Sequence, residues 1–397
     1  MFRLLWLIVT LSSCLQFLFG QDPEIKMTVP EIIQYWGYPV EVHYAVTQDG
    51  YILELHRIPY GKDKPTNNTT RPVVFLQHGL ESSSSVWVTN LPQQSAGFIF
   101  ADAGFDVWMG NMRGNKYSRS HVRLNPIFSS FWEFNWDQMA QYDLPAMIDK
   151  ALMVSGQPYV YYVGHSQGCL TMFVKLSEDP SFSRKVKMFF ALAPAVYMAN
   201  CIGLFKALAI EYSSQLTTWI AYFGSGEFLL NGSFLGYLTP SACETTIQRE
   251  LCKQILFAFG GPSTKNTNTS RITVYLSHFP AGTSSMNILH WVQMINTGTV
   301  TKLDYGQETN IATYGQINPP SYNLRNIPNV PVYIFSGGND WIATEYDIRT
   351  YLIPLLGPRL QMHTYLPEYS HFDFTWGLNA ADDVYKPIMS LIHGSSQ

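Results

Sequence analysis

A serine lies at the centre of a short pattern with a specific chemistry. Residues 164–168 read Gly-His-Ser-Gln-Gly and fit the G-x-S-x-G pattern, with Ser166 in the middle. An apolar run precedes the pattern, and a segment of helical character follows it. Between a strand and a helix, this pattern makes a sharp turn that holds the serine hydroxyl out at the end of the strand. We therefore expect Ser166 to be a nucleophile. The alternative is a glycine–serine turn that arose by chance.

A serine hydroxyl needs a base and an orienting acid, and on a strand–turn–helix scaffold these follow in the order serine, acid, histidine. Asp340 follows the apolar run 332–335 through a glycine-rich turn, which is where the acid is expected. Asp347 lies seven residues further on, in a helical segment, and we expect it to be a surface carboxylate. The spacing therefore predicts Asp340 as the acid.

The base is expected just after a later strand. His371 follows the last apolar run and precedes the final helical segment. His363 lies inside an expected strand and His393 in the terminal tail, so both are poor candidates. Chain order therefore predicts His371 as the base that activates Ser166.

Acyl transfer at a serine also needs donors for the oxyanion. One donor is expected to be the backbone N–H of Gln167, directly after the nucleophile. The other is expected in the loop that ends the apolar run 73–77, which points to the N–H of Leu80. His78 and His165 flank this site, and we expect both to brace the loops rather than react.

The elements that must position these residues alternate along the chain. Helical segments lie between short apolar runs, one of them starting at Asp143 as the expected N-cap and the last spanning roughly 382–392. Short runs of this kind are typical of strands covered on both faces, so the pattern predicts an α/β fold with a mostly parallel sheet. Functional residues should gather at the carboxyl ends of the strands. The expected strands are residues 73–77, 105–109, 159–163, 186–192, 332–335 and 362–366.

Residues 196–311 break this alternation with apolar helical stretches and glycines. We interpret them as a cap inserted between the two parts of the α/β core, residues 21–195 and 312–397. An earlier segment, 42–55, is expected to be a hairpin that turns at 48–50, because Asp-Gly suits a tight turn.

Composition excludes several classes of protein. The chain has 397 residues, of which 46% are hydrophobic and 14% charged, with a net charge of −4. So few charges and so many apolar residues exclude overall disorder and allow a large core. The absence of a basic tract argues against nucleic-acid binding.

The first twenty residues are typical of a secretory signal peptide. Arg3 precedes an apolar run to Phe19, and Gly20 is a small residue suited to cleavage. An uncleaved anchor is the alternative, and no later stretch is long and apolar enough to span a membrane. Export agrees with glycosylation sequons that begin at Asn67, Asn68, Asn231 and Asn268.

Four cysteines remain once the signal segment is removed. Cys243 and Cys252 enclose a short loop and can pair in an oxidising compartment. The alternative is that all four are buried thiols. No cluster of cysteine and histidine indicates a metal site.

Taken together, these motifs resemble the acid lipase family, which includes gastric and lysosomal lipases. The resemblance covers nearly the whole chain after the signal segment, in family order. It is carried by residues 33–39, 49–53, 57–61, 76–80, 110–115, 142–146, 164–168, 191–194, 277–284, 337–340 and 371–374.

The resemblance implies an α/β-hydrolase fold with a mainly helical cap and lid. It implies hydrolysis of triacylglycerols or steryl esters without a cofactor. We expect the protein to act as a monomer at a droplet or membrane surface, without a metal. It assigns the triad to Ser166, Asp340 and His371 and the oxyanion donors to Leu80 and Gln167. It also implies a disulfide between Cys243 and Cys252, and a secreted or lysosomal destination.

Two other functions remain open from sequence. One is a lipid-binding protein on the same scaffold that has lost catalysis, although such a protein has no need of all three triad residues. The other is a hydrolase of peptides or small soluble esters, which a long apolar insertion disfavours. Part of the cap is expected to be a lid that opens at a lipid surface, because residues 202–210 and 219–223 are apolar enough to cover a cleft. The alternative is a fixed cap that only shapes a pocket.

Overall fold

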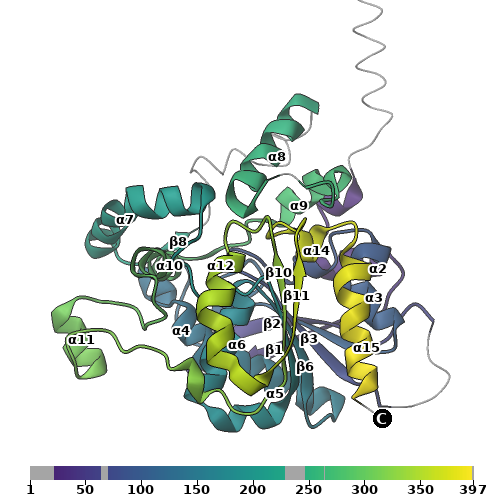
Figure 1. Cartoon of the computed structure of the whole chain (residues 1–397), viewed down its shortest axis with the longest axis horizontal. Coiled ribbons are helices and arrows are strands. Elements are labelled where there is room, and N and C mark those ends of the chain that lie inside the picture. The colour runs from purple at the N-terminus through teal and green to yellow at the C-terminus, as the bar shows by residue number, and fades with distance from the viewer. Residues whose placement is uncertain (1–21, 64–69, 229–245, 263, 396–397) are drawn as a thin grey trace, which may run out of the picture.

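One large sheet runs through the molecule in this computed structural model, which describes residues 22–63, 70–228, 246–262 and 264–395. Its nine strands lie in the order β1-β2-β4-β3-β6-β7-β10-β11, with β5 beside β2 (Figure 1). The signal segment, Asn67, Asn68, Asn231 and Cys243 lie outside the described residues. The strands of the sheet are β1 (Glu41–Val46), β2 (Tyr51–Ile58), β3 (Val73–Gln77), β4 (Asp106–Gly110), β5 (Ser120–His121), β6 (Val160–His165), β7 (Val186–Leu192), β10 (Val332–Gly337) and β11 (Leu360–Leu366).

The sheet is mostly parallel, as the alternating pattern predicted. Every neighbouring pair from β4 to β11 is parallel. The antiparallel pairs all involve β2, which joins β1, β4 and β5. The hairpin of β1 and β2 is also confirmed, and Gly50 in its turn has a φ of +103°, a conformation that glycine adopts without strain.

Helices cover both faces of the sheet (Figure 1). For that reason β3, β4, β6 and β10 are buried along their whole length, which explains why their sequences are continuous apolar runs rather than alternating ones. The α-helices are α2 (Val29–Tyr35), α3 (Ala96–Asp102), α4 (Trp136–Gln138), α5 (Leu144–Ser155), α6 (Gln167–Glu178), α7 (Gly203–Phe223), α8 (Thr246–Gly260), α9 (Ile272–His278), α10 (Ser285–Thr297), α11 (Gln307–Tyr314), α12 (Glu345–Asp347), α13 (Ile353–Leu356), α14 (Asp373–Trp376) and α15 (Lys386–Gly394).

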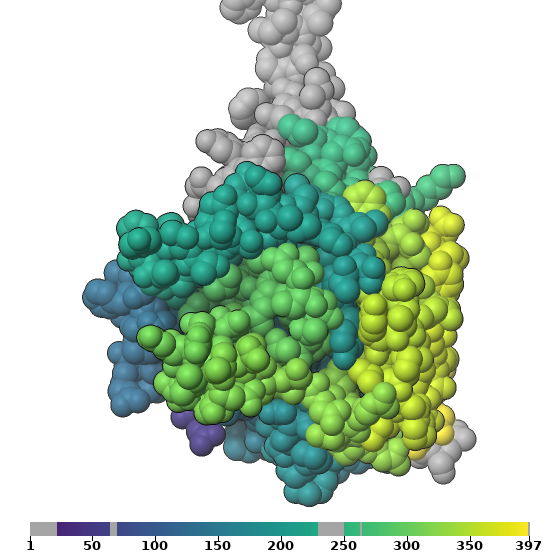
Figure 2. Space-filling model, turned by 60° about the vertical axis from the view of Figure 1, so that its left-hand side comes forward, coloured from purple at the N-terminus to yellow at the C-terminus, as the bar shows by residue number. Residues whose placement is uncertain are grey.

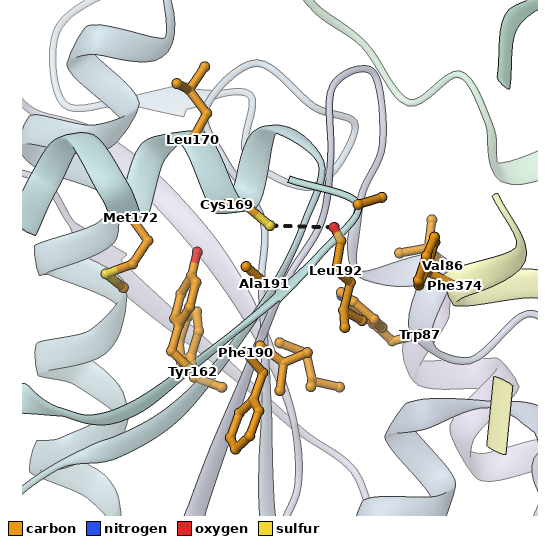
Figure 3. Close-up of a cluster of buried hydrophobic side chains, with 14 of the residues drawn as sticks. Val86, Trp87, Tyr162, Cys169, Leu170, Met172, Phe190, Ala191, Leu192 and Phe374 are labelled. Carbon is orange, nitrogen blue, oxygen red and sulfur yellow. Dashed lines mark hydrogen bonds between the residues drawn. The ribbon is translucent and has the colours of Figure 1, made fainter. Parts of the chain in front are cut away.

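The core beneath the Ser166 turn includes a free thiol. Cys169 on α6 is completely buried, and its Sγ donates to the Leu192 carbonyl of β7 at 3.4 Å (Figure 3). Burial raises the pKa of this thiol well above its usual value, so Cys169 stays neutral and behaves as a small apolar residue.

The expected N-cap of α5 is wrong. Asp143 has helical backbone angles and makes no capping hydrogen bond, because the chain enters α5 through a π-helical turn, Met139–Asp143. Its carboxylate instead accepts from the backbone N–H of Arg113 at 2.9 Å and from Arg113 Nε at 2.7 Å. A buried ion pair takes the place of the cap.

Two other placements are corrected. Asp347 is buried rather than on the surface, because its carboxylate accepts hydrogen bonds from the backbone and side-chain nitrogens of Asn200. His393 lies in the last turn of α15 rather than in a tail, and its ring stacks on Phe105.

The segment 196–311 contributes most of the helical layer above the carboxyl ends of the strands. Helix α7 packs on α8 and α10. A two-stranded antiparallel sheet pairs β8 (Glu227–Phe228), just after α7, with β9 (Thr283–Ser284), just before α10. Figure 2 shows α7 (teal) lying beside the green segments that follow residue 260. Among the described residues, no helix has the length and apolar character to cross a bilayer.

Candidate active site

Ser166 occupies the sharp turn between β6 and α6. Its φ of 54° and ψ of −117° are sparsely populated by residues with a side chain, which makes this a strained position of the kind found at functional sites. The strain is held in place by close packing of the turn. A Cβ on Gly164 would lie 2.9 Å from the Gly168 carbonyl carbon, and one on Gly168 would lie 2.5 Å from the Gln77 carbonyl oxygen. Neither glycine of the pattern therefore has room for a side chain.

Asp340 and His371 form a buried pair. His371 Nδ1 lies 2.9 Å from Asp340 Oδ2, while Asp340 Oδ1 accepts from the backbone N–H groups of Ile342 and Ala343, both at 2.8 Å. An ionised carboxylate only accepts, so Nδ1 carries the hydrogen and Nε2 has a free lone pair. The His371 ring is thus held in the tautomer that a general base requires.

Two contacts fix the backbone of His371. Its N–H donates to the Gly260 carbonyl at 3.0 Å, and its carbonyl accepts from His165 Nε2 at 2.9 Å. The first contact comes from the end of α8 and the second from the residue before Ser166. The loop that carries the imidazole is therefore fixed from both sides.

Ser166 and His371 open into one cavity of about 890 Å³. Asp340 lies behind the imidazole and is not part of its lining. The other walls are almost entirely apolar and come from the loop after β3, from α7, α8 and α10, and from the chain around Phe279. The apolar lining side chains are Leu80, Val86, Leu204, Phe205, Leu208, Ala209, Leu216, Trp219, Phe228, Ile255, Leu256, Phe259, Leu276, Phe279, Ile288, Trp291, Val292, Ile342, Phe372 and Trp376.

The residues predicted as oxyanion donors lie on either side of Ser166. The loop after β3 runs against the nucleophile, since a Cβ on Gly79 would lie 2.9 Å from Ser166 Cβ. Within the described residues, neither Leu80 N–H nor Gln167 N–H donates to another backbone group. The side-chain amide of Gln167 is held away from Ser166, because its Oε1 accepts a hydrogen bond from Trp291 Nε1 at 2.6 Å. Gln167 also begins α6, whose N-terminus favours a developing negative charge.

The two flanking histidines brace the loops, as expected. His78 Nδ1 donates to the Gly79 carbonyl at 2.8 Å, and its Nε2 accepts from Met112 N–H at 3.1 Å. Burial lowers the pKa of His78 to about 4 and that of His165 to about 3, so both rings are neutral near pH 7.

Sequence reasoning missed a second buried carboxylate beside His371. Asp373 accepts from Ser370 N–H and Oγ, and from the hydroxyls of Thr264 and Thr267. It therefore ties the His371 loop to the chain that follows α8. The signal was a lone acidic residue between Phe372 and Phe374 in an otherwise apolar run.

Glu81 was also missed. It lines the cavity directly after Leu80, has a φ of 57°, and its buried carboxyl faces the backbone of Gly282 and, among the described residues, no cation. Burial raises the pKa of Glu81 well above its usual value, which favours the neutral carboxyl in the folded protein. An acidic residue directly after His-Gly-Leu was the visible signal.

Of the predicted modification sites, Asn268 and Cys252 lie among the described residues. The Asn268 side chain is buried, and its Nδ2 donates to Asn90 Oδ1 and Gln94 Oε1, both at 2.9 Å. A glycan on Nδ2 would displace at least one of these contacts. Cys252 is buried on α8, and its pairing with Cys243 stays a prediction.

Comparison with known proteins identifies close relatives of this chain. Residues 29–91 match the family model of a partial α/β-hydrolase lipase region, and residues 72–374 match that of the α/β-hydrolase fold. The lipase lipl-1 of Caenorhabditis elegans is 47% identical over 97% of this chain and 96% of its own length. Human lysosomal acid lipase/cholesteryl ester hydrolase is 45% identical over 94% of this chain and 92% of its own length. Human gastric triacylglycerol lipase is 42% identical over 98% of this chain and 99% of its own length.

A solved structure supports the fold alone. The crystal structure of a putative lipase from Acinetobacter baumannii superposes with a TM-score of 0.54 at 13% identity, covering 95% of this chain and 99% of that one.

Proposed function

Because this chain belongs to the acid lipase family of α/β hydrolases and is a carboxylic ester hydrolase, we propose that it cleaves triacylglycerols, steryl esters or both through Ser166, His371 and Asp340. The observation that carries the proposal is the buried Asp340–His371 pair, whose imidazole opens with Ser166 into one apolar cavity. The names of the relatives, a cholesteryl ester hydrolase and a triacylglycerol lipase, support both substrate classes.

In the proposed reaction, Ser166 Oγ attacks the ester carbonyl carbon while His371 Nε2 takes the hydroxyl proton. The carbonyl oxygen becomes an oxyanion that accepts from the N–H groups of Leu80 and Gln167. As the tetrahedral intermediate collapses, the alcohol leaves with the proton from His371, and the acyl group remains on Ser166. Water then repeats the sequence and releases the fatty acid. Asp340 stabilises the imidazolium that forms in both steps.

The size and lining of the cavity support a bulky lipid as substrate. A volume of about 890 Å³ lies near the upper end for ligand pockets, and the walls offer apolar contact rather than hydrogen bonds. This lining disfavours peptides and small soluble esters. A lipid-binding protein without activity remains the second candidate, because an apolar cavity serves binding equally well.

We propose residues 196–311 as the cap and α7 as its lid. Phe205, Leu216 and Trp219 on α7 line the cavity, and Gly224 at its C-terminal end has a φ of +78°, which marks a point where the backbone can pivot. Opening at a droplet or membrane surface would give the apolar side of this helix a lipid partner. We also propose entry into the secretory pathway through residues 1–20, with a lysosomal or extracellular destination and a disulfide between Cys243 and Cys252.

Covalent trapping tests the proposal directly. A long-chain p-nitrophenyl alkylphosphonate should label the protein once, and mass spectrometry should place the adduct on Ser166. Fatty-acid release from emulsified triolein and cholesteryl oleate should be present in the wild type and absent in Ser166→Ala. If lipid binds the cavity but nothing is labelled or released, the protein is a lipid binder without catalysis.

A further inference from the structure

An exposed apolar patch is formed by the last turn of α7 together with a neighbouring loop that belongs to neither α7 nor the rest of residues 196–311. Ile127 is 83% exposed and Phe128 64% exposed, and Val122 on the same loop is also largely exposed. Across from them, Tyr222 and Phe223 in the last turn of α7 are 81% and 72% exposed. Large apolar side chains that gather on a surface in this way mark an interaction site.

The loop and the end of α7 are neighbours in space. A Cβ on Gly224 would lie 3.0 Å from Ser129 Cβ, and Ser225 Oγ donates to the Trp132 carbonyl at 2.6 Å. Arg119 pairs with Glu227 through two hydrogen bonds, of 2.6 and 2.8 Å. Figure 2 shows the loop (blue) beside the outer end of α7 (teal). Five large apolar side chains therefore share one corner of the molecule.

The loop is rigid enough to present its side chains. Asn125 Oδ1 accepts from Ile127 N–H, and the Asn125 carbonyl accepts from Phe128 N–H, both at 3.0 Å. Trp132 Nε1 donates to the Pro126 carbonyl at 2.8 Å. These bonds fix the backbone, while the Ile127 and Phe128 side chains project into solvent. Their exposure therefore adds nothing to the stability of the fold.

The position and the charge of the patch indicate a partner. Trp219 on α7 lines the cavity, while Tyr222 and Phe223, three and four residues on, belong to the patch, so the patch adjoins the cavity wall. Arg123 on the loop is exposed, and no carboxylate pairs with it among the described residues. Apolar side chains flanked by an uncompensated cation match a phospholipid surface, where rings enter the acyl boundary and the cation meets phosphate.

We propose that Val122, Arg123, Ile127 and Phe128 form a fixed anchor that docks the protein on the phospholipid surface of a lipid aggregate, next to the cavity wall that α7 supplies. The inference deepens the proposed lipase function and rests on it for its biological purpose. The anchor is distinct from the lid, since these residues do not belong to α7 and line no part of the cavity. Docking holds the cavity against the phase that contains the substrate.

The test is vesicle binding, which requires no catalysis. The double variant Ile127→Ser/Phe128→Ser should reduce partition onto phosphatidylcholine–phosphatidylglycerol vesicles at least about tenfold, in line with the apolar area removed. Met153→Ser on α5 is the matched control, because Met153 is 69% exposed but lies away from the patch, and it should bind as the wild type does. Equal binding of the double variant and the wild type would overturn the proposal.

Two further measurements separate docking from folding and from catalysis. Hydrolysis of p-nitrophenyl butyrate below its solubility limit should change less than about twofold in the double variant, while hydrolysis of emulsified triolein should fall with binding. Arg123→Glu should weaken binding to the anionic vesicles at low salt but not at high salt. If the double variant loses activity on the soluble ester to the same extent, the residues act on the fold and the anchor is refuted. If the wild type binds vesicles but hydrolyses nothing, the proposed function fails while the anchor stands.

Discussion

Replacing Asp340 by asparagine should stop catalysis by trapping His371 in the wrong tautomer. Asp340 Oδ1 accepts two backbone N–H groups, from Ile342 and Ala343, so the asparagine must place its carbonyl oxygen there. Its NH₂ group then faces His371 Nδ1, which can only accept from it. The ring hydrogen moves to Nε2, and no lone pair remains to take the proton of Ser166.

The expected loss is large, while the fold should be little affected. A tautomer error of this kind lowers kcat by about 10⁴, which corresponds to about 5.5 kcal/mol of transition-state stabilisation. Because asparagine has the shape of aspartate and keeps both backbone contacts, the unfolding midpoint should remain close to that of the wild type. The assay is kcat and KM for p-nitrophenyl butyrate, with near-UV circular dichroism as the check on folding.

Asp347→Asn is the matched control. Asp347 is equally buried and only seven residues away, but it binds Asn200 rather than a histidine. Its loss should cost about 1–3 kcal/mol of stability by disturbing that pair, and it should change kcat less than about threefold. If Asp340→Asn kept more than a tenth of the activity while Asp347→Asn abolished it, the assignment of the acid would be refuted.

Three other outcomes are expected. Ser166→Ala and His371→Ala should each lower kcat by about 10⁴–10⁶, and the double variant should be hardly worse than the worse single one, since the two act as a unit; multiplicative losses in ester assays would contradict this. Gly168→Ala should lower stability by about 1–3 kcal/mol, because its Cβ would meet backbone oxygen at 2.5 Å. Gly394→Ala, where nothing lies within 4 Å, should have little effect, and denaturant melts compare the two. Because folding raises the pKa of Glu81, the wild-type fold has its full stability below pH 4.5, where the carboxyl is protonated in both states. It loses stability as the pH rises, because the unfolded chain ionises more readily. Glu81→Gln should therefore gain stability relative to the wild type between pH 5 and pH 8, and a constant difference across that range would show that Glu81 is not neutral in the fold.

The sequence predicted those parts of the site that local pattern determines. The turn at Ser166 follows from a strand, two glycines and a helix within twenty residues, and the order of Asp340 and His371 follows from the strands before them. The mostly parallel sheet follows in the same way, because the buried strands are nearly continuous apolar runs. These features depend on neighbours in the chain.

The parts that could not be predicted depend on partners distant in the chain. Asp143 resembled an N-cap because aspartate is common there, but Arg113, thirty residues earlier, takes its carboxylate. Asp347 resembled a surface residue because its partner Asn200 lies near the start of the insertion, far from Asp347 in the chain. No local pattern reveals that such a carboxylate will be buried. The free-energy cost of taking it out of water is offset only when the distant donor is in place.

The chain that follows α8 has a consequence for protein engineering. Gly260 accepts from the backbone of His371, and Thr264 and Thr267 bind Asp373, so this stretch is built into the loop that carries the imidazole. A chimaera that exchanges residues 196–311 for the corresponding segment of a relative would therefore replace part of the support of the His371 loop together with walls of the cavity. Crossover points placed before Gly260 would leave that support with its native parent, while exchanging the cavity walls that α7 and most of α8 supply.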